Sequence, residues 1–199
     1  KGAMVTTVAD AARHLDVAAG PDDRDRTSLP ATATVYEQAI ETLDVRGLRA
    51  AWSTDLGFAV VDPEVAELTH AAAVELCAAA GLELVDRPIA FGDLPKMWQG
   101  AGLIDLWQDL EKGMWPDRAE ELYYINRYFL RTSEDVPARA MARILDRRFA
   151  MEEQVAEVFA DIDVLLTPTT ACTAFAADGP MPTSIAGQDG PPTMAVPFT

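Results

Sequence analysis

The sequence predicts an α/β fold in which helices cover a partial mixed β-sheet containing a parallel strand–helix–strand unit. Two observations carry this prediction. Short apolar runs bounded by turn residues occur at 48–53, 82–86 and 163–167, and apolar residues recur at helical spacing between them. The first two runs flank a single helical pattern, so the strands that they form should be parallel and joined by a right-handed crossover.

The first predicted helix begins near Val8. Thr7, followed three residues later by Asp10, is typical of a capping box, and Gly20 with Pro21 ends the pattern. The apolar face of this helix is expected to comprise Val8, Ala12, Leu15 and Ala19. We interpret residues 22–45 mainly as a surface connection, because they open with Asp, Ser and Pro turn residues.

The predicted strand–helix–strand unit occupies residues 46–90. A buried strand at 48–53 precedes a helix that Asp62 caps and Pro63 begins, and Gly81 ends that helix before the second strand at 82–86. The buried stripe of the helix is expected to comprise Val65, Leu68, Ala72, Leu76 and Ala79.

Residues 91–160 form the predicted helical segment, with helices at 91–112, at 118–130 and from Pro137 onward. The last helix carries one apolar stripe of Met141, Ile144, Met151, Val155 and Val158, and beside it a second of Leu145, Phe149, Ala156 and Phe159. A third buried strand at 163–167 is followed by a Pro/Gly-rich loop. We therefore expect one partial domain over 1–199. It begins with a helix and a connecting loop at 1–45, continues through the two segments described above, and ends with the strand and loop at 161–199.

Charge limits the classes of function. The 199 residues include 16 Lys+Arg and 32 Asp+Glu, which gives a formal net charge of −16, and 49% are hydrophobic. That apolar fraction is typical of a globular protein. The shortage of basic side chains argues against binding nucleic acid or an anionic membrane surface. Without a signal peptide or a membrane-length apolar run, we expect no membrane partner and a cytoplasmic location.

Neither a metal site nor a nucleophile is visible in the sequence. Cys77 and Cys172 form no CxxC pair, and neither His14 nor His70 has another His or Cys at ligand spacing. We expect Cys77 to be a buried helical thiol. The four serines lie outside Gly-Ser-rich turns of the kind that expose a nucleophile. They are Ser28, Ser53, Ser133 and Ser184.

Aromatic residues gather between positions 98 and 128. They are Trp98, Trp107, Trp115, Tyr123, Tyr124 and Tyr128. A role in the core or in an interface is the simpler interpretation of this cluster, and a pocket lined by aromatic rings is the alternative. On these grounds alone the sequence describes an acidic α/β domain without a visible active site.

Several stretches nevertheless resemble one family, in order along nearly the whole chain. The stretches are Met4–Ala12, Ala19–Asp25, Arg46–Ser53, Asp55–Gly57, Val61–Val65, Asp161–Thr169 (with the motif D-V-L-L-T-P-T) and Ala195–Thr199. Together they are similar to the part of the amidase-signature hydrolases that follows the catalytic core.

The resemblance implies amide hydrolysis through a Ser–Ser–Lys triad and an acyl-enzyme, without a metal or an organic cofactor. The lysine and the Gly-Ser-rich signature of that family precede the stretch that Met4–Ala12 resembles, so no residue of 1–199 inherits a catalytic role. The resemblance also implies that later segments wall the substrate pocket. The candidate substrate-binding residues are Thr167, Pro168, Trp98 and Trp107.

Three hypotheses of function follow. The first is a portion of an amidase that hydrolyses a small-molecule carboxamide, with residues 1–199 inactive on their own. The second is a non-catalytic acidic α/β binding or scaffold domain, and the third is a portion of the amidase subunit of a transamidase complex. The sequence also leaves open whether the protein forms a homodimer.

Overall fold

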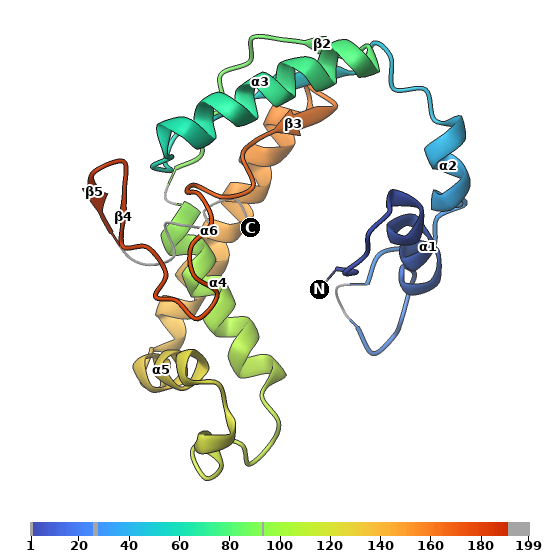
Figure 1. The fold of residues 1–199 in the computed structure, drawn as a ribbon. Coiled ribbons are helices and arrows are strands. Elements are labelled where there is room, and N and C mark those ends of the chain that lie inside the picture. Colours follow the sequence, from blue (N-terminus) through green and yellow to red (C-terminus); the bar gives the residue numbers. More distant parts are fainter. Residues whose placement is uncertain (1, 26–27, 93, 191–199) are drawn as a thin grey trace. The chain divides into compact units, whose positions relative to one another are not determined.

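The computed structural model describes residues 2–25, 28–92 and 94–190 (Figure 1) and, for residues 94–99, only the backbone. Two compact units are distinguished, Lys1–Val45 and Arg46–Thr199, and each is described by itself. The single partial domain expected from the sequence stays a prediction.

The first unit pairs two helices, α1 (Val8–Ala18) and α2 (Tyr36–Thr42). Thr7 caps α1 as predicted, because its hydroxyl accepts a hydrogen bond from the Asp10 amide at 3.1 Å. The prediction that residues 22–45 are mainly a connection was wrong for α2. Its first amides donate to the carboxylate of Asp16 on α1, from Tyr36 at 2.6 Å and from Glu37 at 3.1 Å. A side chain distant in sequence therefore caps this helix, and local patterning does not reveal such a cap.

Three parallel strands form the sheet of the second unit. They are β1 (Arg49–Trp52), β2 (Glu83–Leu84) and β3 (Val164–Leu166), in the order β2-β1-β3. The predicted α/β class and all three predicted strands are confirmed. Asp163 holds β3 to β1, because its amide donates to the Arg49 carbonyl and its carboxylate accepts from the Arg49 amide, each at 2.8 Å.

Helix α3 (Pro63–Ala80) connects β1 to β2 with the predicted ends. The Asp62 carboxylate accepts from the Glu64 amide at 2.9 Å, and Gly81 ends the helix at φ 69°. The predicted buried stripe was wrong, because Leu68 and Leu76 are 63% and 50% exposed. The small side chains of Ala73 and Cys77 are the buried ones, which confirms Cys77 as a buried thiol. Small residues let a helix backbone lie close to a sheet, and α3 is apolar on too many sides for periodicity alone to identify its inner face.

The helical segment comprises α4 (Leu94–Asp109), the short 3-10 helix η1 (Ala119–Glu121), α5 (Tyr124–Ser133) and α6 (Ala138–Phe159). Figure 1 shows α4 and α6 side by side, with α5 near one end of the pair. The helix predicted at 118–130 is divided into η1 and α5. The Arg127 guanidinium explains the division, because it donates to the carbonyls of Glu120 at 3.2 Å and Leu122 at 3.0 Å.

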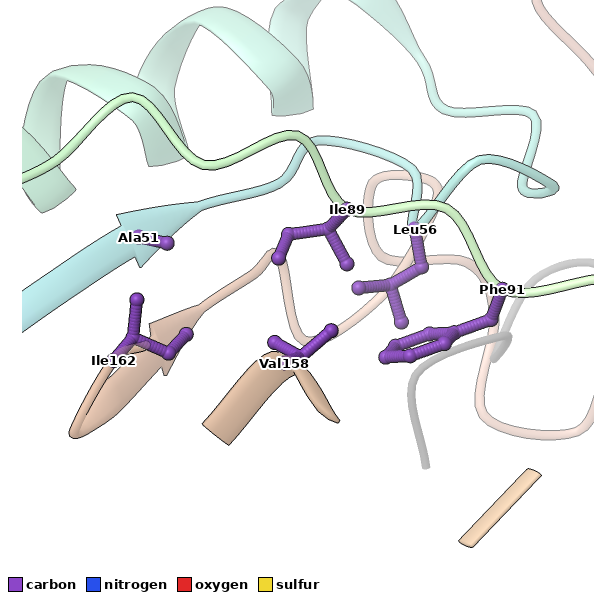
Figure 2. Packing of buried hydrophobic residues seen from close by; sticks show 6 residues of the cluster. All are labelled: Ala51, Leu56, Ile89, Phe91, Val158 and Ile162. Carbon is purple, nitrogen blue, oxygen red and sulfur yellow. The ribbon is translucent and has the colours of Figure 1, made fainter. Parts of the chain in front are cut away.

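The core joins the sheet to α6 (Figure 2). Its buried side chains are Ala51, Leu56, Ile89, Phe91, Val158 and Ile162, and Met151 and Val155 pack against them. Phe91 therefore belongs to the core ahead of α4 rather than to the helix predicted from residue 91. The first predicted stripe of α6 faces this core at its C-terminal end, whereas the members of the second stripe are exposed.

The Pro/Gly-rich stretch after β3 contains a hairpin that the sequence interpretation missed. Its strands are β4 (Ser184–Ile185) and β5 (Gln188–Asp189), which pair antiparallel around a two-residue turn. Ala186 and Gly187 make that turn at φ 49° and 75°, the left-handed geometry typical of tight hairpins. Ala195–Thr199, part of the quoted resemblance, lie outside the described residues.

Candidate functional site

The carboxyl edge of the parallel sheet brings two loops together. β1 ends at Trp52 and β3 at Leu166, and these two residues are register partners. The Ser53 amide continues the ladder by donating to the Leu166 carbonyl at 3.0 Å. Ligands of parallel sheets bind beyond the carboxyl ends of the strands, so the turn after β1 and the loop after β3 form the candidate edge.

The turn after β1 is built from hydrogen bonds to short polar side chains. The buried Ser53 hydroxyl accepts from the Leu56 amide at 3.0 Å, and the Asp55 carboxylate accepts from the Gly57 amide at 2.7 Å. Leu56 and Gly57 both have left-handed backbone, with φ of 52° and 80°. The Leu56 carbonyl accepts from the Phe91 amide at 2.8 Å, which fixes the turn to the core segment.

The loop after β3 is anchored at two buried positions. Pro168 is fully buried, and Ala171, also buried, accepts a hydrogen bond at its carbonyl from the Asp62 amide at 2.8 Å. Thr167, just before Pro168, is half-buried. Thr169 and Thr170, between Pro168 and Ala171, are exposed. The structure thus places the predicted pair Thr167 and Pro168 at the carboxyl edge, with the proline as an anchor and the threonine at the surface.

The edge offers hydroxyl groups and an indole beside the exposed carboxylate of Asp55. Trp52 donates through its indole Nε1 to the Thr54 hydroxyl at 3.0 Å, and its ring lies 5.6 Å from that of His70 on α3. Such a set can orient a polar ligand through hydrogen bonds and ring contacts. The hydroxyls of Ser53 and Ser133 are engaged in holding backbone, which does not resemble an activated nucleophile.

Trp107 lies in a different environment, between α4 and α5. Its indole Nε1 donates to the hydroxyl of the buried Ser133 at 2.9 Å, and that hydroxyl donates to the Phe129 carbonyl at 2.6 Å. The ring of Trp115 meets the Trp107 ring edge-on at 6.4 Å and 86°. This arrangement ties two helices together, which matches the core interpretation of the aromatic cluster at this position.

The two candidate tryptophans occupy separate positions along α4. Positions 98 and 107 are about two and a half helical turns apart in that helix. The side chain of Trp98 lies outside the described residues. The tyrosines of the same cluster are exposed at the start and along the surface of α5, at Tyr123, Tyr124 and Tyr128.

Shifted pKa values occur at exposed pairs of oppositely charged side chains. The hydrogen bond from Arg24 holds the pKa of Asp22 below its usual value, and the hydrogen bond from Arg118 does the same for Glu121. Across the described ranges, no three His, Cys, Asp or Glu side chains lie together in a way that could hold a metal ion. In the same ranges, no helix is both long enough and apolar enough to cross a membrane.

The sequence interpretation missed the turn at 53–57 as part of the site. The available signal was the spacing of Ser53, Asp55 and Gly57, which follow the strand directly at intervals of two residues. Both side chains accept hydrogen bonds from amides within the same turn, as short polar residues commonly do.

Comparison with known proteins identifies relatives over most of the chain. The family model described as Amidase matches residues 1–199. An acylamidase of Rhodococcus erythropolis is 31% identical over 178 residues, which cover 87% of this chain and 36% of the relative. A glutamyl-tRNA(Gln) amidotransferase subunit of Thermosynechococcus vestitus is 27% identical over 202 residues, covering 88% of this chain and 41% of that protein.

Solved structures agree at the level of the fold. A bacterial aryl acylamidase of the amidase-signature enzymes superimposes with a TM-score of 0.73 at 22% identity, over 96% of this chain and 41% of that one. A 6-aminohexanoate cyclic dimer hydrolase follows at a TM-score of 0.68 and 20% identity, over 84% and 36% of the two chains. The chain spans roughly two fifths of the length of these relatives. With the family model matched from end to end, the chain belongs to the amidase family.

Proposed function

We propose that this chain is a portion of an amidase that hydrolyses carboxamide C–N bonds, and that residues 1–199 supply structure and pocket wall rather than the catalytic triad. The observation that carries the proposal is the amidase match over residues 1–199, together with 31% identity to an acylamidase. The mechanism implied by the resemblance is attack by a serine of a Ser–Ser–Lys triad, which forms an acyl-enzyme that water then hydrolyses.

The serine environments support the non-catalytic part of this proposal. Ser53 and Ser133 are buried and engaged in local hydrogen bonds. Ser28 is held to Asp22, since its hydroxyl accepts from the Asp22 amide at 3.1 Å and lies 3.3 Å from the Asp22 carbonyl as a donor. An activated serine instead needs a base within hydrogen-bond reach and donors for the oxyanion.

A direct test measures ammonia or aniline release from aliphatic amides and anilides by the purified 199-residue chain. We expect no turnover above the uncatalysed rate, because no group of the chain is assigned as nucleophile or base. Turnover that survives replacement of all four serines by alanine would contradict the assignment of the chemistry. The amidase interpretation itself fails if the coding sequence preceding these residues encodes no lysine followed by a Gly-Ser-rich loop.

Within the proposed pocket wall, Thr167 at the carboxyl edge is the favoured contact and the buried Pro168 anchors its loop, while Trp98 and Trp107 are secondary. In the intact enzyme, Thr167→Val should raise KM for a small amide several-fold if its hydroxyl orients substrate. Thr169→Val, an exposed neighbour on the same loop, is the matched control. Equal effects of the two variants would argue against a specific role for Thr167.

A component of a transamidase complex is the second candidate. It is favoured by several amidotransferase subunits among the relatives. One of them, from Streptococcus pyogenes, is a glutamyl-tRNA(Gln) amidotransferase subunit that is 28% identical over 89% of this chain. Hydrolysis of free carboxamides by the intact protein without partner proteins would favour the amidase. Activity that requires further partner proteins and glutamine would favour the transamidase.

A further inference from the structure

Two adjacent tyrosines face each other where α5 begins. The ring centroids of Tyr123 and Tyr124 lie 4.6 Å apart, and the ring planes are tilted by 58°. Neighbouring residues inside a helix do not face each other, because their side chains point about 100° apart. Tyr123 instead directly precedes the helix, with non-helical backbone at φ −57° and ψ 139°. The contact between the two rings therefore depends on the backbone at this helix start.

The two phenols are accessible and are joined by a hydrogen bond. Tyr123 is 65% exposed and Tyr124 is 62% exposed. The hydrogen bond with Tyr124 raises the pKa of the Tyr123 phenol, so this phenol keeps its proton at neutral pH. The pair is thus held together at both its rings and its hydroxyls, and a small reagent in solution can reach it.

The other tyrosines lie apart from this pair. Tyr128 is one helical turn after Tyr124 and is 60% exposed, but its ring contacts that of Phe129, at 5.6 Å. Tyr36 belongs to the first unit of the chain. Among the described residues, the contact between two phenol rings is that of Tyr123 with Tyr124. Exposure alone therefore does not distinguish this pair from Tyr128, whereas the ring contact does.

We propose that Tyr123 and Tyr124 form an oxidative modification site, at which a one-electron oxidant joins the two rings into a dityrosine within one chain. Each phenol loses one electron and its hydroxyl proton, which gives a phenoxyl radical. The two radicals form one carbon–carbon bond between ring positions next to the hydroxyls. The hydrogens displaced from these two positions restore the hydroxyls.

The electrons and protons of this reaction balance with a peroxide-class oxidant. The tyrosine pair releases two electrons and two protons in all. One persulfate ion takes up the two electrons and becomes two sulfate ions, while the protons pass to water. A haem peroxidase with hydrogen peroxide has the same stoichiometry, because one peroxide takes up both electrons and both protons and becomes two water molecules.

Proximity and charge both favour coupling within one chain over coupling between chains. Two rings that the fold holds in contact react as an intramolecular pair and need no collision. Coupling between copies would bring a net charge of −16 against another −16, and this repulsion slows the encounter. The cross-link would join the residue before α5 to the first residue of that helix.

The test treats the purified 199-residue chain with persulfate and a light-activated ruthenium(II) polypyridyl complex, followed by digestion with trypsin and mass spectrometry. Trypsin cuts after lysine and arginine, so Tyr123 and Tyr124 stay in the single peptide 119–127, whereas Tyr128 lies in the peptide 128–131. We expect the peptide 119–127 to lose two hydrogen atoms and to show dityrosine fluorescence. Per tyrosine consumed, this product should be roughly tenfold more abundant than any cross-link between two peptides.

Two variants and one peptide serve as comparisons. Tyr124→Phe should lower the yield of this product roughly tenfold or more, because phenylalanine forms no phenoxyl radical. Tyr128→Phe, an equally exposed position on the same helix, is the matched control and should leave the yield unchanged. A synthetic peptide of residues 119–127 keeps the two tyrosines adjacent without the fold, and its yield per tyrosine consumed should be roughly fivefold lower or less.

Four results would overturn the proposal. They are no intrachain product, products mainly between two peptides, an equal yield from the synthetic peptide, and a loss of yield in Tyr128→Phe that matches the loss in Tyr124→Phe. An equal yield from the synthetic peptide would show that sequence adjacency, not the fold, brings the rings together. The readout is a covalent product, so the outcome is independent of amide hydrolysis.

Discussion

Two residues in left-handed backbone shape the turn at the carboxyl edge. Leu56 adopts φ 52°, which a branched side chain rarely does, and the Ser53 hydroxyl and the Phe91 amide hold it there by hydrogen bonds to its amide and its carbonyl. Gly57 follows at φ 80°, where its missing side chain also leaves room for the neighbouring segment. A Cβ atom at Gly57 would lie 2.7 Å from Cα of Ala90.

Gly57→Ala should therefore lower the free energy of unfolding by about 2 kcal/mol or more, from backbone strain and a backbone clash together. Gly47→Ala is the matched control, because Gly47 has φ 79° and nothing within 4 Å of the added carbon. That control should cost only the left-handed strain, about 1 kcal/mol. Urea unfolding of both variants measures the difference, and equal losses would show that Ala90 moves aside freely.

At the scale of single elements, the inner face of α3 is defined by its smallest side chains. Ala73 and Cys77 are buried, whereas the larger Leu68 and Leu76 point away from the sheet. The close approach of this helix to the strands therefore depends on small volume rather than on large apolar area.

Ala73→Leu should destabilise the fold by about 1–3 kcal/mol, because three added carbon atoms have no space under α3. Leu76→Ala should change stability by about 0.5 kcal/mol or less, although it removes as many carbon atoms as Ala73→Leu adds. Thermal unfolding of the two variants compares the faces. A larger loss of stability for Leu76→Ala than for Ala73→Leu would contradict this assignment and favour the buried stripe expected from periodicity.

The junction of α4 and α5 depends on one hydroxyl. Ser133→Ala removes the acceptor of the Trp107 indole and should cost about 1–2 kcal/mol, since a partly buried N–H is left without a partner. Thr132→Ala is the control, because the exposed Thr132 hydroxyl donates only to carbonyls of its own helix. We expect a shift of the tryptophan emission maximum for Ser133→Ala alone. The same emission shift in both variants would contradict this prediction, because it would show that the shift does not arise from loss of the hydrogen bond between Trp107 and Ser133.

Elements whose signals are local could be predicted from the sequence. The helix from Asp62 and Pro63 to Gly81 has its cap, first-turn proline and left-handed stop within its own residues. Helix α2 could not be predicted in this way, since its amides depend on Asp16 some twenty positions earlier. The inner face of α3 and the division between η1 and α5 likewise depend on packing and on the reach of Arg127.

The candidate site followed the same rule. The end of a strand at Pro168 was visible in the sequence, and β3 ends at Leu166 just before Thr167 and Pro168, whereas the role of these two residues in binding stays a prediction. That Trp52 and Leu166 are register partners depends on strand pairing across more than one hundred residues. No local pattern reports that pairing, so the turn at Ser53 was not recognised as part of the same edge.

Across the whole molecule, acidic charge outnumbers basic charge in both units by the same ratio. Residues 1–45 contain 4 Lys+Arg and 8 Asp+Glu, and residues 46–199 contain 12 and 24. Even if every basic group paired with one carboxylate, half of the carboxylates would have no such partner. The ion pairs that do form, such as Arg118 with Glu121, are solvent-exposed and contribute little each.

Repulsion among the remaining carboxylates should therefore outweigh the surface ion pairs, and screening should stabilise the chain. The Debye length falls from about 30 Å at 0.01 M salt to about 10 Å at 0.1 M. Raising sodium chloride from 10 to 200 mM should thus add about 1 kcal/mol, or roughly 2–4 °C in Tm. An uncharged osmolyte at equal osmolality controls for general solute effects. A fall in Tm with salt would mean that the exposed pairs outweigh the repulsion, despite the excess of carboxylates in both units.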